Sequence, residues 1–252
     1  MIGRVILRVA DRDRVRSYYE RTIGLHALSE SSLGVDGTPL IELVGDPAAP
    51  PSPPGRTGLF HLALLVPDRP SLARAVKRVV ASGERFTGAS DHFVSEALYL
   101  RDPEGNGIEI YRDRPRSEWE YEANGEIRMG TVALDVDGVL AELPGGEDPG
   151  MPDRTVIGHV HLHVADLDAA ERFYAGELGL DVTVRGYPGA LFLSHDGYHH
   201  HIGLNTWQGP GAPPPPPGSR GLVGFELLLP DAEPAELADP SGNRLLVRTP
   251  AG

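Results

Sequence analysis

The chain is built from four copies of one small unit, and this internal repeat constrains its fold more than any single motif does. Two copies end in similar turns, Asp-Pro-Glu-Gly-Asn at residues 102–106 and Asp-Pro-Ser-Gly-Asn at residues 239–243. Glycine in such a turn supplies the positive φ that a tight connection between strands requires. Each copy begins with an apolar strand that runs into an aspartate, at residues 5–11, 61–68, 159–166 and 225–231.

The repeating unit consists of a strand, a helix and three further strands, which predicts an α+β protein. The four units cover residues 2–46, 58–112, 156–208 and 221–249. The fourth unit is truncated, because only 8 residues separate Asp231 from Asp239, whereas 34 separate Asp68 from Asp102 in the second. We therefore expect its helix and at least one strand to be missing.

The segments between the units differ in composition. Residues 46–55 and 209–218 are rich in proline, which cannot continue a helix or a central strand, so both are predicted to be linkers. Residues 113–155 form a less regular connection with one expected strand at residues 129–136.

The composition excludes several classes of protein. Cysteine is absent, which excludes a disulfide framework and a thiolate metal site. The formal net charge of −13 argues against a nucleic-acid partner, because neutralising phosphates requires a basic surface. The sequence has neither a leader pattern nor an apolar run of membrane-spanning length, so a cytoplasmic protein with no membrane partner is expected.

Aligning the units on the aspartate that ends each first strand reveals candidate metal ligands. Seven residues before it, the second and third units have His61 and His159, whereas the first and fourth have Arg4 and Gly224. Seven residues after the aspartate of the second unit's turn is Glu109, where the fourth unit has a leucine. Singly, each would be an ordinary buried histidine or a surface carboxylate. Together they match the two-histidine, one-carboxylate set that leaves open positions on a non-haem Fe(II) ion.

The chain also resembles the vicinal oxygen chelate superfamily, which includes glyoxalase I, fosfomycin-resistance proteins and extradiol ring-cleaving dioxygenases. In particular it is similar to the short bacterial catechol 2,3-dioxygenase-like proteins. The resemblance covers nearly the whole chain and rests on residues 58–68, 90–119, 157–167 and 197–207. The segment Asp-Pro-Glu-Gly-Asn-Gly-Ile-Glu is only moderately specific, but its combination with Tyr-His-His-His-Ile-Gly-Leu-Asn-Thr-Trp is much more so.

The resemblance implies roles for individual residues. It makes His61, His159 and Glu109 the ligands of Fe(II), with Mn(II) as an alternative. Tyr99 stands ten residues before the glutamate, where extradiol enzymes have a tyrosine that hydrogen-bonds the substrate oxygen. Matching the aliphatic tail of the His-His-His-Ile-Gly-Leu motif makes His200 the acid–base residue.

Other residues are expected around the substrate. The family has a second pocket histidine nine residues before its tyrosine; that position here is Ser90, and the nearest histidine, His92, is taken as a further catalytic candidate. The expected substrate-binding residues are His161, His199, His201 and Tyr111. Strand residues alternate between faces, so at least one histidine of 199–201 is expected to be solvated. His161 and His163 share the face of His159 and either line the pocket or make ordinary hydrogen bonds.

Because the ligands come from the second and third units, we expect these two units to form the working cup and the first and fourth to form the other. The predicted fold is therefore four βαβββ modules, the fourth truncated, in two cup-shaped mixed β half-barrels with helices outside. Along the chain, residues 1–113 would form a first domain of modules 1 and 2, residues 114–155 a connector, and residues 156–252 a second domain of modules 3 and 4.

The predicted function is an Fe(II)-dependent extradiol dioxygenase whose substrates are a catechol-type aromatic and dioxygen. One alternative is a metal-dependent, glyoxalase-like isomerase or lyase built from the same modules. Another is a small-molecule binding protein without a metal, of the kind that sequesters drugs. The sequence leaves the oligomeric state open, although edge strands in the truncated fourth unit could pair in a homodimer.

Overall fold

A computed structural model describes residues 1–230 and 232–250, so the strand end predicted at Asp231 lies outside the described residues. The first unit contains β1 (Ile2–Val9), α1 (Arg12–Tyr18), a π-helical turn η1 (Tyr19–Ile23), β2 (His26–Ala27), β3 (Ser32–Val35) and β4 (Thr38–Gly45). The second contains β5 (Gly58–Leu65), α2 (Arg69–Ala81), β6 (Gly88–Asp91), β7 (Ser95–Arg101) and β8 (Gly107–Asp113). Both units have the predicted order of elements.

The third unit repeats this order and the fourth is shorter. The third contains β10 (Val156–His163), α4 (Leu167–Glu171), a π-helical turn η3 (Arg172–Glu177), β11 (Asp181–Val184), β12 (Ala190–Ser194) and β13 (Ile202–Asn205). The fourth contains β14 (Gly221–Leu228), β15 (Ala235–Ala238) and β16 (Arg244–Arg248). Among the described residues no helix separates β14 from β15, which agrees with the predicted truncation.

The aspartate that ends each first strand has a structural role in the complete units. The side chains of Asp11, Asp68 and Asp166 each accept a hydrogen bond from the backbone N–H three residues later, so each caps the helix that follows. The repeated turns also agree in detail. Asp102 and Asp239 each accept two backbone N–H bonds within their turns.

The connector differs from its predicted structure. It contains η2 (Arg116–Glu118), β9 (Val132–Ala133) and α3 (Val136–Ala141). The strand predicted at residues 129–136 was therefore largely wrong, since only two of its residues form β9. The chain turns into a helix instead because the side chain of Asp135 accepts the N–H of Gly138 at 2.9 Å and caps α3.

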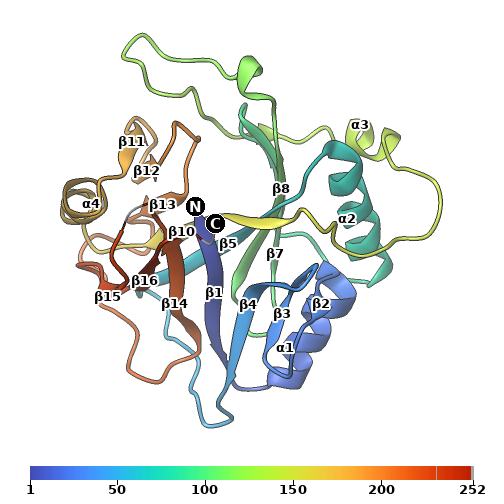
Figure 1. Ribbon diagram of the computed structural model, residues 1–252, viewed down its shortest axis with the longest axis horizontal. Coiled ribbons are helices and arrows are strands. Elements are labelled where there is room, and N and C mark those ends of the chain that lie inside the picture. The colour runs from blue at the N-terminus through green and yellow to red at the C-terminus, as the bar shows by residue number, and fades with distance from the viewer. Residues whose placement is uncertain (231, 251–252) are drawn as a thin grey trace.

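The strands form two mixed sheets that pair the units crosswise. The seven-stranded sheet has the order β15-β16-β14-β1-β4-β3-β2, and the nine-stranded sheet has the order β11-β12-β13-β10-β5-β8-β7-β6-β9. In Figure 1 the blue strands of the first unit accordingly lie beside the red strands of the fourth. The predicted pairing of unit two with three and of unit one with four is confirmed, as is the α+β class. The domain limits at residues 113 and 156 stay a prediction.

One hydrophobic core joins the two sheets. Alternation along β5 and β10 sends Leu62, Leu64, Val160 and Leu162 into this core, where they form one cluster with buried residues of β1 and β14. Helix α2 contributes a further row of buried side chains, Leu72, Ala75, Val76 and Val79. The alternate residues of β5 and β10 therefore point away from the core, and these include the histidines of interest.

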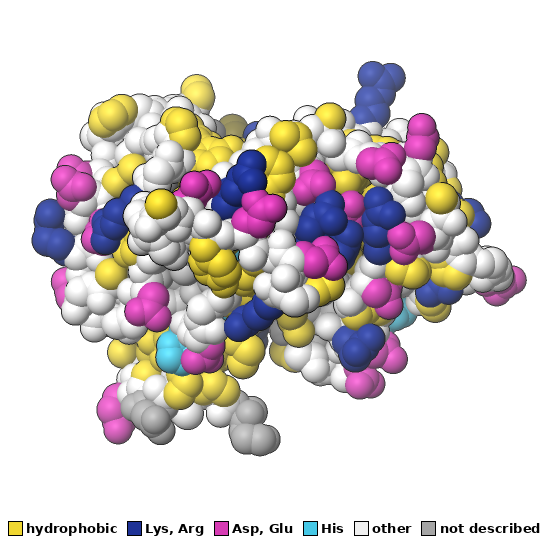
Figure 2. Space-filling view, turned by 90° about the horizontal axis from the view of Figure 1, so that it is seen from above, with side chains coloured by type: hydrophobic (Ala, Val, Ile, Leu, Met, Phe, Trp, Pro, Cys, Tyr) yellow, Lys and Arg dark blue, Asp and Glu magenta, His cyan; other side chains and the backbone are white. Residues whose placement is uncertain are grey.

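The outer surface carries charges of both signs. On the face drawn in Figure 2, Lys and Arg side chains are interspersed with Asp and Glu side chains. Within residues 1–230 and 232–250, no helix has the length and apolar character needed to cross a membrane.

Candidate active site

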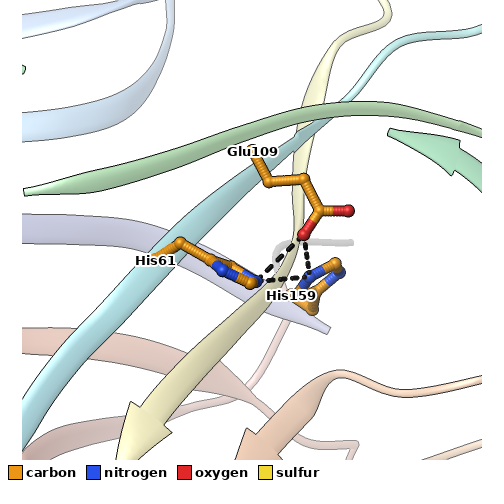
Figure 3. Close-up of side chains that lie close together, drawn as sticks. All are labelled: His61, Glu109 and His159. Atoms are coloured by element: carbon orange, nitrogen blue, oxygen red, sulfur yellow. Dashed lines mark hydrogen bonds and ion pairs between the residues drawn. The ribbon is translucent and has the colours of Figure 1, made fainter. Parts of the chain in front are cut away.

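Three side chains from three adjacent strands converge on one point. His61 on β5, His159 on β10 and Glu109 on β8 are all buried, and Figure 3 shows their tips turned toward one another. His61 Nε2 lies 3.3 Å from His159 Nε2. Glu109 Oε2 lies 2.9 Å from His61 Nε2 and 3.1 Å from His159 Nε2. Strand pairing produces this convergence, because β5 neighbours β10 on one side and β8 on the other.

The donor atoms fit a divalent metal ion. Ligands at right angles on an octahedral ion, each about 2.1 Å from it, lie about 3.0 Å apart. The three separations here run from 2.9 to 3.3 Å. Two imidazoles and one carboxylate also supply the nitrogen and oxygen ligands that Fe(II), Mn(II) and related ions accept at one face.

The charge states suit the same purpose. Burial lowers the pKa of His159 to about 4, so this imidazole stays neutral near pH 7 with a lone pair to offer. Burial alone would raise the pKa of Glu109, but the two neighbouring imidazoles outweigh it and hold that pKa well below its usual range. The neutral His159 imidazole and the ionised Glu109 carboxylate are the forms in which these side chains bind a divalent cation.

A cavity of about 390 Å³ opens beside these ligands. Its walls are largely aromatic and apolar, formed by Phe60, Phe192, Trp207, Tyr187 and Met129. The polar groups that reach it include Tyr99, His92, His161 and His200 as well as the three ligands. Of the residues predicted to be catalytic, the structure thus gathers all three around one cavity of small-molecule size.

Tyr99 and His92 contact each other at the cavity. The two residues are joined by a hydrogen bond of 2.6 Å between Tyr99 Oη and His92 Nε2. His92 Nδ1 lies 2.7 Å from the carbonyl oxygen of Gly130, which can only accept a hydrogen bond, so this nitrogen carries the proton. His92 Nε2 therefore accepts a hydrogen bond from the Tyr99 hydroxyl. Burial, and then the charge of Glu109, raise the pKa of Tyr99 well above its usual value, so it remains a phenol.

The three consecutive histidines have different surroundings. His200 lines the cavity and packs on His159 with ring centroids 4.1 Å apart. His199 lies behind it, fully buried, with Nε2 at 2.9 Å from Asp113 Oδ1. His201 faces away from the cavity, where its Nδ1 accepts the backbone N–H of His195 at 3.2 Å. The expectation that one of the three is solvated was wrong, because Tyr198 and the chain around it bury all of them.

Three residues predicted to bind substrate do not line the cavity: His199, His201 and Tyr111. Tyr111 is buried beneath the ligands, and its hydroxyl lies 2.7 Å from that of Tyr198. The lack of a side chain at Gly158 leaves room for the Tyr111 hydroxyl, because a Cβ at that position would lie 1.8 Å from it. His161 does reach the cavity, whereas His163 bonds Asn205 Oδ1 through Nδ1 at 2.6 Å.

The sequence reasoning missed Asp113, which binds His199 and also accepts the Tyr198 hydroxyl at 3.1 Å. A signal was present, because Glu109, Tyr111 and Asp113 occupy alternate positions of β8 and so share a face. The aromatic walls from Phe60 and Trp207 were missed as well, since they come from strands and loops far apart in the sequence.

Comparison with known proteins identifies the family. A model described as the Glyoxalase/Bleomycin resistance protein/Dioxygenase superfamily matches residues 1–110. The catechol-2,3-dioxygenase of Bacillus subtilis (strain 168) is 42% identical over 244 residues, which cover 94% of this chain and 85% of that protein. The chain belongs to the glyoxalase/bleomycin resistance/dioxygenase superfamily.

Solved structures of other proteins share the superfamily fold. A putative dioxygenase from Bacillus subtilis subsp. subtilis str. 168 matches with a TM-score of 0.63 and 12% identity, over 98% of this chain and 84% of that one. Glyoxalase I from Zea mays matches with a TM-score of 0.58 and 15% identity, over 98% of this chain and 91% of that one. At such low identities these likenesses concern the fold alone.

Proposed function

We propose that this superfamily member is a non-haem Fe(II)-dependent extradiol dioxygenase, which opens a catechol-type ring beside its two hydroxyls. The observation that carries the proposal is the convergence of His61, His159 and Glu109 within 2.9–3.3 Å at a cavity that also contains Tyr99 and His200. The 42% identity to a catechol-2,3-dioxygenase supports the same reaction class.

Fe(II) held by these three ligands would supply the Lewis acidity that lowers the pKa of the substrate hydroxyls and the redox centre that couples the ring to dioxygen. The ligand set itself leaves adjacent positions open for both substrates. Mn(II) accepts the same ligands, so metal analysis of the purified protein has to identify the bound ion.

Tyr99 orients the substrate by accepting a hydrogen bond from it. Its own proton is donated to His92 Nε2 at 2.6 Å, because His92 Nδ1 is committed to the Gly130 carbonyl. The phenol oxygen therefore has lone pairs free for a substrate hydroxyl that keeps its proton. In this way His92 acts as the positioning residue of Tyr99, although it stands two residues from the position at which the family has its pocket histidine.

His200 handles the other hydroxyl. Burial lowers the pKa of His200 well below its usual value, so it begins neutral. It can take the proton of one substrate hydroxyl as a general base and later return a proton, as a general acid, to an oxygen of the product that forms as the ring opens. His161 also reaches the cavity, and its Nε2 has no hydrogen-bond partner among the described residues, which suits a contact with substrate.

The remaining walls bind and shield the ring. Phe60, Phe192 and Trp207 surround the cavity with aromatic faces and edges, and Phe60 packs against His161 and Trp207 with ring centroids 5.2 and 5.3 Å apart. Such walls favour a flat aromatic substrate and exclude water from the ligands.

The first experiment is to purify the protein without oxygen, measure bound metal, and compare the wild type with His61→Ala and Glu109→Gln. About one Fe(II) or Mn(II) per chain is expected in the wild type and none in the variants, since each loses a ligand. His26→Ala is the matched control, because His26 is exposed on β2 of the other sheet. Circular dichroism verifies that all variants are folded.

A catechol screen that follows the yellow ring-opened product then tests the reaction. Turnover by the wild type and by His26→Ala, but not by the ligand variants, is the expected result. A bound metal without ring cleavage of any catechol would favour the glyoxalase-like alternative. Wild-type protein that binds no metal after reconstitution would end the dioxygenase proposal and favour a small-molecule binding protein.

A further inference from the structure

A chain of hydrogen bonds leads away from the cavity behind His200. His200 Nδ1 lies 2.7 Å from His199 Nδ1. His199 Nε2 lies 2.9 Å from Asp113 Oδ1, and the same oxygen accepts the hydroxyl of Tyr198 at 3.1 Å. The proposed function uses only the first member of this chain.

The direction of each hydrogen bond follows from the carboxylate of Asp113, at which the series of bonds ends. An ionised carboxylate can only accept, so His199 Nε2 carries a proton and donates it to Asp113. A His199 ring that carries this one proton has a bare Nδ1, which must accept its hydrogen bond from His200. His200 therefore carries its proton on Nδ1, and its Nε2 is left with a lone pair. Because His200 lines the cavity, this lone pair is the ring nitrogen available to a ligand there.

We infer that Asp113 is a positioning residue that acts through His199 to fix the tautomer of His200, so that the nitrogen of His200 available to the cavity accepts a proton rather than donates one. The inference rests on the proposed function for its catalytic meaning, but the tautomers themselves do not. It gives a function to His199 and to Asp113, neither of which lines the cavity.

The surroundings isolate this chain from competing partners. His199 is fully buried, and Trp119 packs on it with ring centroids 5.5 Å apart. Trp119 is itself held by a hydrogen bond of 3.0 Å from Nε1 to the Arg114 carbonyl. Among the described residues, the only ion pair of Asp113 is with His199, since the nearby Arg114 bonds Asp91 and Glu96 instead. No arginine therefore takes the place of His199 at the carboxylate.

The consequence for the reaction is a defined starting state. A substrate hydroxyl breaks its O–H bond and gives the proton to His200 Nε2, which forms an N–H bond and becomes an imidazolium. The other ring proton stays on Nδ1, and the added positive charge is stabilised by the hydrogen bond to His199 and, through it, by Asp113. The opposite tautomer would present an N–H to the substrate hydroxyl and could not accept its proton.

The test reads the tautomers directly by ¹⁵N–¹H correlation of the histidine rings in the full-length protein, loaded with Zn(II) as a diamagnetic probe and again without metal. The wild type should show His199 protonated at Nε2 and His200 at Nδ1. In Asp113→Leu, which keeps a side chain of similar size but has no acceptor, the Nε2–H of His199 loses its partner. The single tautomer of each ring should then be lost, with the opposite tautomers appearing. Wild-type rings with the opposite pattern, or an unchanged pattern in Asp113→Leu, would overturn the inference.

Tyr198→Phe is the matched control, because it removes the other hydrogen bond to Asp113 but leaves the carboxylate on His199. It should keep the wild-type tautomers. In the Fe(II) enzyme, Asp113→Leu should lower kcat by about 100-fold or more with a much smaller change in KM, the size expected when a base presents the wrong tautomer. A purely structural role would instead appear as unfolding or metal loss. If no ring cleavage is found at all, the tautomer result still decides the inference.

Discussion

The two sheets follow one plan but differ at the positions that decide whether a metal can bind. In the nine-stranded sheet the central pair, β5 and β10, carries His61 and His159. In the seven-stranded sheet the equivalent pair, β1 and β14, carries Arg4 and Gly224. Arg4 donates from Nε to Glu226 Oε1 at 3.0 Å, an internal ion pair in place of a ligand set.

The difference shows why one sheet of a duplicated fold can bind a metal ion and the other cannot. Each sheet has a carboxylate near its central strands, Glu109 buried and Glu226 half-buried, but beside Glu226 the positive charge belongs to the protein itself. Arg4 cannot give up its proton, so Glu226 is neutralised permanently. Among the described residues Glu109 pairs with two imidazoles and with no arginine or lysine, so an added cation can take the place that Arg4 has in the other sheet.

The largest predicted effect comes from placing an arginine at position 61 of the nine-stranded sheet, as Arg4 stands in the seven-stranded one. His61→Arg should place a permanent cation beside Glu109 and abolish metal binding, a loss of more than the 10–100-fold typical of outer-shell changes. Metal titration by calorimetry measures it. The reciprocal change, Arg4→His, should leave one ion per chain, because Gly224 and Leu246 offer no further ligand. A second ion bound by Arg4→His would contradict the comparison.

A second prediction concerns the stability of the seven-stranded sheet, which carries no metal ligands. Phe225 is fully buried, so Phe225→Ala should lower the free energy of unfolding by about 3–5 kcal/mol. Metal affinity of the folded variant should not change, since Phe225 lies in the sheet without ligands. Urea unfolding and metal titration of one preparation separate the two quantities. Phe192→Ala in the cavity wall is the counterpart, and it should raise KM for the aromatic substrate.

The last predicted effect is an acid sensitivity of the nine-stranded sheet. Burial lowers the pKa of His159 to about 4 and that of His201 to about 3, against about 6.5 in the unfolded chain. Below about pH 6.5 the unfolded state thus binds more protons, so the stability of the metal-free protein falls as the pH drops toward 4. Each group contributes at most about 1.4 kcal/mol per pH unit.

Urea midpoints of the metal-free protein, compared at about pH 7.5 and about pH 5, measure this sensitivity. His159→Leu should reduce the pH dependence, because one of the depressed groups is gone. Arg4→Leu should leave it unchanged, since arginine does not titrate in this range. Equal pH dependence in the wild type and in His159→Leu would mean that His159 carries no part of the effect.

Much of the fold could be predicted because its signals are repeated along the chain. The spacing from Asp68 to His61 and from Asp166 to His159 was enough to anticipate which units share a sheet, since ligands of one ion must be neighbours. The strand at 129–136 failed for the opposite reason. It occurs once, and the capping side chain of Asp135 outweighs the local β-propensity.

The site was predictable only to the level of which residues carry chemistry. Alternation along a strand could not tell His199 from His200, because residues 198–201 precede β13 and follow an irregular path. Tyr111 and Asp113 share a face with Glu109, but how deep each lies depends on packing by Tyr198 and on the space left at Gly158. Such depth is a property of tertiary contacts, which a single sequence does not display.

The crosswise pairing also determines the order in which strands can pair while the chain is being synthesised. The contacts are nested like brackets: β5 pairs with β10, and only around them does β1, made first, pair with β14, made nearly last. Partners so distant in sequence give a high contact order and slow closure. During synthesis β1 can pair with β4 of its own unit, but its other edge stays unpaired until β14 has been made, and an unpaired strand edge favours aggregation.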